Sequence, residues 1–103
     1  MNHDMAVIEG VFDIILPKVP TSLHRWGRVV WLQDIEVGAK GKFLSIENGR
    51  YSSTHLSRIT NIIKTRENLE IHTENSIYKL RVLPRDTYGS FMERGSVNEP
   101  NPF

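Results

Sequence analysis

The chain has 103 residues, of which 39% are hydrophobic and 24% charged, and its formal net charge is +1. A chain of this length folds as one domain around one core, and its composition argues against wholesale disorder. It contains no cysteine, which excludes disulfides, thiol nucleophiles and thiolate metal sites and favours a reducing compartment.

The apolar stretches are too short to cross a membrane. The stretch Phe12–Leu16 contains Asp13 and is far shorter than the roughly 20 residues that a membrane helix requires. His3 and Asp4 stand where a signal peptide would carry basic residues. We therefore expect a cytoplasmic protein with no membrane contact.

The first third of the chain is expected to contribute two strands. Ala6–Ile8 and Val11–Leu16 are apolar and rich in β-branched residues, and a proline closes them, which favours a strand. Pro17–Ser22 forms a loop, because each proline biases its predecessor toward extended geometry. Arg28–Leu32 then forms the second strand.

The clearest local signal is a hairpin in the middle of the chain. After a turn at Gly38–Gly41, the segments Lys42–Ile46 and Arg50–Thr54 flank the dipeptide Asn48-Gly49. Asn-Gly fits the positive φ angles of a type I′ turn. We predict that the two segments pair as antiparallel strands.

Residues 53–65 fit two structures. Leu56, Ile59 and Ile62 fall at helical spacing behind an N-cap at Ser53 or Thr54. The same stretch is rich in Thr and Ile and also shows the alternation of a strand. We favour the strand because of the two segments that follow.

Those two segments alternate between apolar and polar residues. Leu69–Thr73 and Tyr78–Val82 are preceded by the turn residues Arg66–Asn68 and Glu74-Asn75, respectively. With residues 53–65 as the first strand, they form a three-stranded meander whose apolar residues share one face.

The expected fold is therefore mainly β, as a small antiparallel barrel or curved sheet of SH3-like or pleckstrin-like type. One short helix near 53–65 remains the alternative there, and it would give an α+β roll. Residues 1–84 form the single β-rich domain. Residues 85–103 are rich in Gly, Pro and Asn, and we expect an irregular or disordered tail.

No motif for catalysis or for a cofactor is visible. Gly38–Lys42 has too few residues between its glycines for a phosphate-binding loop. The four histidines, at positions 3, 24, 55 and 72, lie too far apart for a metal motif, and no serine stands in a Gly-x-Ser-x-Gly elbow. Asp34 and Glu36 at strand spacing would share a solvated face. We expect no enzymatic activity, no metal and no cofactor.

Basic residues are concentrated in the centre of the chain. From Lys18 to Arg66 there are nine Lys or Arg and three Asp or Glu, a balance that favours nucleic acid or an acidic partner. The alternative is a solvated surface with counter-charges folded beside it. Aromatic residues among these bases either stack on unpaired nucleobases or fill the core. The binding candidates are Lys40, Lys42, Arg50, Arg58, Trp26 and Arg28.

Two segments carry a resemblance. Ser53-Thr54 opens the segment that ends at Ile59, and a Thr-x-Asn-Ser-x-Tyr pattern lies within Glu70–Leu80. Together they resemble small uncharacterised phage and prophage proteins over less than a third of the chain. The pattern implies a hairpin, because Asn and Ser satisfy a turn locally. Phage proteins of this kind bind and redirect or inhibit a host macromolecule, so the resemblance implies a binding role.

Two functional hypotheses follow. The leading one is a non-catalytic binding module that acts through protein–protein interaction, as a phage-type modulator or inhibitor of a host macromolecule, because exposed sheet edges suit such contacts. The alternative is a small nucleic-acid-binding barrel that uses the basic central patch. Salt dependence separates them, because phosphate contacts release counterions.

Overall fold

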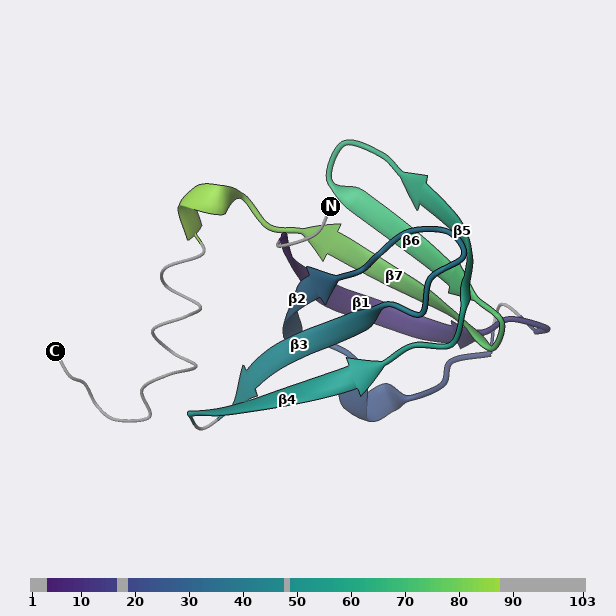
Figure 1. Cartoon of the computed structure of the whole chain (residues 1–103), viewed down its shortest axis with the longest axis horizontal. Coiled ribbons are helices and arrows are strands. Elements are labelled where there is room, and N and C mark those ends of the chain that lie inside the picture. Colours follow the sequence, from purple (N-terminus) through teal and green to yellow (C-terminus); the bar gives the residue numbers. More distant parts are fainter. Residues whose placement is uncertain (1–3, 17–18, 48, 88–103) are drawn as a thin grey trace, which may run out of the picture.

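A computed structural model of the chain describes residues 4–16, 19–47 and 49–87 (Figure 1). No helix in these residues is long and apolar enough to cross a membrane. Their elements are β1 (Met5–Asp13), η1 (Leu23–Arg25), β2 (Val29–Gln33), β3 (Lys42–Glu47), β4 (Arg50–His55), β5 (Ile59–Lys64), β6 (Asn68–Thr73), β7 (Ser76–Val82) and η2 (Arg85–Thr87), where η marks a short 3-10 turn.

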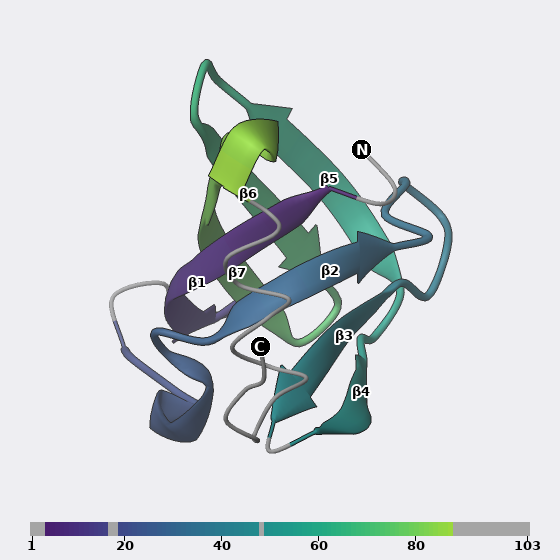
Figure 2. The ribbon, with the colours of Figure 1, turned by 90° about the vertical axis from the view of Figure 1, so that its left-hand side faces the viewer.

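The seven strands form one antiparallel sheet in the order β4-β3-β2-β1-β7-β6-β5. The edge strands β4 and β5 are nevertheless consecutive in the chain, with only residues 56–58 between them. The sheet therefore curls until its two edges approach each other at one end (Figures 1 and 2). Among the described strands β4 and β5 do not pair, so the curl stays open. The expected mainly β fold with a curved antiparallel sheet is confirmed.

Backbone hydrogen bonds hold the curl where the chain passes from β4 to β5. The Leu56 N–H donates to the Gly41 carbonyl at 2.9 Å. Ile59 donates its N–H to Ala39 at 2.9 Å and accepts the N–H of Gly38 at 2.8 Å. The turn predicted at Gly38–Gly41 thus lies against the passage between the two edges.

Residues 53–55 and 59–64 are strands, so the preference for a strand over a helix is confirmed, but the meander begins at Ile59 and residues 53–55 pair with β3 instead. β4 ends at His55 and β5 begins at Ile59. Leu56 and Ile59 are both buried in the core. Alternation did not indicate the break at 56–58, because the break arises from the passage between the two sheet edges.

The inner face of the curled sheet encloses the core. The Phe43 and Tyr78 rings meet edge to face with centroids 5.2 Å apart, which joins β3 to β7 across the curl. The buried cluster consists of Ala6, Ile8, Val11, Val30, Leu32, Ile35, Phe43, Leu56, Ile59, Leu69, Ile71, Tyr78 and Leu80.

The β6–β7 hairpin turns at Glu74-Asn75, as predicted. The Thr73 hydroxyl accepts the N–H groups of Asn75 and Ser76 at 3.2 and 3.0 Å. It also donates to the Ser76 carbonyl at 3.2 Å, and Tyr78 returns to the core. In this chain the Thr-x-Asn-Ser-x-Tyr pattern therefore builds a tight turn.

The described chain closes beside the start of β1. Arg85 donates from Nη2 to Asp4 Oδ1 at 3.0 Å, and the Leu83 N–H donates to the Met5 carbonyl at 2.9 Å. Residues 85–87 form η2. The rest of the predicted tail, residues 88–103, lies outside the described residues.

The β3–β4 hairpin has the predicted two-residue loop. Glu47 pairs with Arg50, which leaves two residues between the strands. Gly49 has a φ of +74°, a value that side chains rarely tolerate. Asn48 lies outside the described residues.

Replacing Gly49 with Val is expected to lower the free energy of unfolding by about 1–2 kcal/mol, because a β-branched residue is forced to a positive φ angle. Urea denaturation measures the loss. Ser53→Val, at an exposed strand position, is the matched control and should stay within about 0.5 kcal/mol of the unmodified protein. Equal stability of both variants would contradict the turn.

Candidate functional site

Large apolar side chains are exposed mainly in the segment 14–23, between β1 and β2. Ile15 is 81% exposed, Leu23 66%, Leu16 61% and Val19 46%. These four residues, which we call the apolar tip, make up more than half of the seven large exposed hydrophobic residues in the described chain. Figure 2 shows η1, which carries Leu23, on the left of the molecule and β4 on the right. Clustered exposed apolar residues mark interaction sites more often than scattered ones do.

Hydrogen bonds tie residues 13–16 to Val19. Asp13 Oδ1 accepts the N–H of Ile15 at 2.7 Å and that of Leu16 at 2.9 Å. The Val19 N–H donates to the Leu16 carbonyl at 2.9 Å, and the Asp13 N–H donates to Val19 at 3.0 Å. A bridge between Phe12 and Pro20 closes the base. Ile15, Leu16 and Val19 are therefore held relative to one another, which lowers the entropy cost of binding.

Trp26 and Arg25 fix the segment that follows Pro20 to the rest of the domain. The Trp26 ring packs on Phe12 with centroids 5.5 Å apart, and its Nε1 donates to the Thr21 carbonyl at 3.0 Å. Arg25 Nη1 donates to the Tyr78 hydroxyl at 2.8 Å, which anchors η1 to β7. Trp26, one of the candidate binding residues, is half-buried against the core.

The tip replaces the end of an expected strand. Val11–Leu16 was predicted to be extended, but β1 ends at Asp13 and residues 14–16 bend away. The reason is the Asp13 carboxylate, which binds two following N–H groups and so offers the backbone an alternative to the ladder. The sequence signal for this turn is an Asp followed by three aliphatic residues and a proline. The prediction of a strand gave more weight to the β-branched residues than to this signal.

The candidate basic residues divide between two ends of the sheet. Lys42, the first residue of β3, pairs with His55 at the end of β4. Arg58 follows closely and donates from Nη1 to the Gly38 carbonyl at 2.8 Å, and Lys40 is exposed in the same turn region. These three bases therefore lie together at one end.

Arg50 and Arg28 lie at the other end. Arg50 begins β4, five residues before His55, which corresponds to about 17 Å along a strand. Arg28 immediately precedes β2, which runs antiparallel to β3. The basic residues of the central part of the chain thus form two separate groups in the structure rather than one patch.

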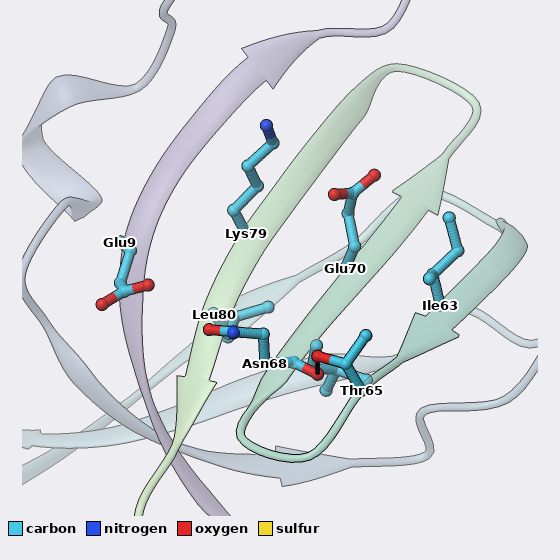
Figure 3. A pocket seen from close by; sticks show the side chains of 8 residues that line it. Glu9, Ile63, Thr65, Asn68, Glu70, Lys79 and Leu80 are labelled. Carbon is cyan, nitrogen blue, oxygen red and sulfur yellow. Dashed lines mark hydrogen bonds between the residues drawn. The ribbon is translucent and has the colours of Figure 1, made fainter.

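A shallow groove of about 340 Å³ lies across β1, β7, β6 and β5 (Figure 3). Lys79 and Glu70 rise from neighbouring strands toward the same side. Glu70 contacts His72 at 2.7 Å, Glu9 pairs with Arg81 at 3.1 Å, and the Lys79 ammonium lies 5.1 Å from the Phe12 ring centre. Each charged side chain of the groove thus contacts a residue outside the groove lining. In the described ranges no three His, Asp or Glu side chains gather as metal ligands.

Comparison with known proteins gives no relative: no family model, no curated protein and no solved structure matches the chain. The fold and its surface define a small, open antiparallel β protein that carries an apolar tip.

Asp13→Ala is expected to loosen the tip without unfolding the domain. Amide hydrogen exchange at Ile15 and Leu16 should accelerate about tenfold, because a carboxylate acceptor contributes about 1.5–3 kcal/mol and this one is partly solvated. Asp86→Ala, an exposed acid in η2, is the control and should leave both amides unchanged. Unaltered exchange in Asp13→Ala would show that the turn does not depend on this carboxylate.

Proposed function

We propose that the protein is a non-catalytic binding module that docks on a partner protein through the apolar tip. The observation that carries the proposal is the exposure of Ile15, Leu16, Val19 and Leu23 on a segment held by backbone and Asp13 hydrogen bonds. Exposed aliphatic side chains lower the solubility of a monomer, and burying each would contribute about 1.5–3 kcal/mol. Burial of these aliphatic side chains in a partner's pocket would supply hydrophobic free energy, and the hydrogen-bonded backbone would lower the entropy lost on binding.

The partner surface is a concave apolar pocket rather than a second tip. Two convex tips of four side chains each would bury far less than the roughly 800 Å² per partner of a stable interface. A pocket surrounds the protruding side chains and removes more of their surface from water. A phage-type role in modulating a host macromolecule is supported by the resemblance of Ser53–Ile59 and Glu70–Leu80 to small phage proteins, and a partner in the cytoplasm is supported by the absence of cysteine.

The proposal is tested by removing the aliphatic anchors. The double variant Ile15→Ser/Leu16→Ser is expected to lose capture of a specific protein from a bacterial lysate, and to weaken binding to that purified protein at least tenfold. Val37→Ser is the matched control, because Val37 is also 61% exposed but lies between β2 and β3. Equal capture by the double variant would overturn the role of the tip.

Nucleic-acid binding is the second candidate, favoured by the grouping of Lys40, Lys42 and Arg58 at one end of the sheet. This grouping is smaller than the patch required by a phosphate-tracking groove, since Arg50 lies at the far end of β4.

We expect no binding of single-stranded or duplex DNA or RNA in fluorescence anisotropy at 50 mM salt. If binding does occur and Lys40→Gln/Lys42→Gln reduces its log-log salt slope by about two units, nucleic acid becomes the favoured partner, because each lost phosphate contact lowers that slope by about one.

A further inference from the structure

The edge strand β4 is exposed and pairs regularly with β3. Its six residues pair with β3 in one unbroken register. Residues 51–54 carry no charge, and five of the six β4 residues are exposed. Long, regular, uncharged edges are the ones that pair with further strands.

The other edge strand, β5, is protected. Its register shifts between Ile59 and Asn61, which indicates a bulge. The Asn61 side chain accepts the N–H of Ile62 at 2.9 Å, and the start of the strand is covered by Gly38 and Ala39. Bulges and covering loops are the usual ways to block an edge. The two edges therefore differ in their capacity to pair.

The hydrogen-bond phase of the hairpin shows which groups of β4 point outward. In a two-residue hairpin the pair next to the loop, Glu47 and Arg50, is hydrogen bonded, and bonded pairs then alternate. The hydrogen bond from the Leu56 N–H to the Gly41 carbonyl agrees with this alternation, because Gly41 and Leu56 are the next bonded pair beyond the strand ends. The N–H and C=O groups of the intervening residues therefore face away from β3. These residues are Tyr51, Ser53 and His55.

A second copy of β4 is a poor occupant of this edge. When two copies pair antiparallel through their outward groups, Ser53 lies opposite Ser53 and Tyr51 opposite His55. A second copy therefore brings no acidic residue to Arg50 or to the Lys42–His55 pair, because β4 contains none. An incoming strand with an acidic residue at each end would face Arg50 at one end and the Lys42–His55 pair at the other.

We propose that β4 pairs antiparallel with an extended segment of a partner protein that has an acidic residue at each end and β-branched residues between them. The acids face Arg50 and His55, and the β-branched residues pack beside Tyr51, whose side chain is 70% exposed. Backbone bonds give the affinity, and the charges set the register. This inference rests on the proposed function only in that the segment belongs to a protein.

The test uses the synthetic peptide acetyl-Glu-Thr-Val-Thr-Val-Glu-amide as the probe, titrated to millimolar concentration in ¹H–¹⁵N NMR. We expect saturable shifts of the Tyr51, Ser53 and His55 amides and cross-strand contacts to β4. The same peptide with Lys in place of both Glu should bind at least fivefold more weakly. Equal affinity of the two peptides, or shifts confined to β5, would overturn the inference.

Two pairs of variants complete the test. Ser53→Pro removes an outward N–H without touching the β3 ladder and should abolish the shifts, with circular dichroism confirming the fold. Ser53→Val keeps the N–H and should bind normally. Arg50→Gln should weaken binding about two- to fivefold, whereas Lys64→Gln on β5, also exposed, should not. Normal binding by a folded Ser53→Pro variant, or a β4-mediated dimer that Ser53→Pro disrupts, would refute the inference.

The two proposals fail separately. Peptide binding at β4 should persist in Ile15→Ser/Leu16→Ser, so loss of lysate capture alone tests the tip. If the tip captures a protein while the acidic peptide leaves β4 unperturbed, the edge inference falls and the proposed function stands.

Discussion

The structure depends on the short passage that joins the two edges of its own sheet. Residues 56–58 connect β4 to β5, which are the two edge strands of the sheet. The seven-stranded sheet therefore has to curl until these two edges come close to each other. Gly41 makes this packing possible. A Cβ there would lie 2.7 Å from Ile35 Cδ1 and 2.9 Å from the Asp34 carbonyl, closer than real contacts allow. A glycine therefore fits against Asp34 and Ile35 while its carbonyl accepts the Leu56 N–H.

The same constraint decides which surfaces remain available. The turn that holds the passage covers the start of β5, and a bulge distorts that strand beyond it, whereas β4 keeps a regular ladder up to the hairpin loop. The Asp13 turn interrupts the chain between β1 and β2 on the other side of the molecule (Figure 2) and leaves its aliphatic residues in solvent. Core formation thus accounts for the inner face, and neither exposed surface contributes to it.

Local chemistry explains which parts could be predicted. Alternation placed Leu69, Ile71 and Leu80 on one face, and Asn48-Gly49 and Glu74-Asn75 located the hairpin loops, because these signals act between near neighbours. The apolar tip was not predicted, because Ile15 and Leu16 favour a strand by residue type. Their N–H groups bind the Asp13 carboxylate instead of a neighbouring strand. The division of the basic residues was beyond sequence reasoning as well. It follows from strand direction, which sends Arg50 and Lys42 to opposite ends of one hairpin.

The tip and the β4 edge are complementary in energetic terms. A six-residue strand pair at a solvated edge is weak by itself, because backbone bonds made in water contribute little net free energy. Aliphatic anchors in a pocket supply affinity but little directional information. A partner that holds the tip raises the effective concentration of its own extended segment at β4 to about the millimolar range when the linker can span the distance. Strand pairing that is marginal for a free peptide would then become populated, and in the proposed complex the charges of Arg50 and Lys42 would select the segment that pairs.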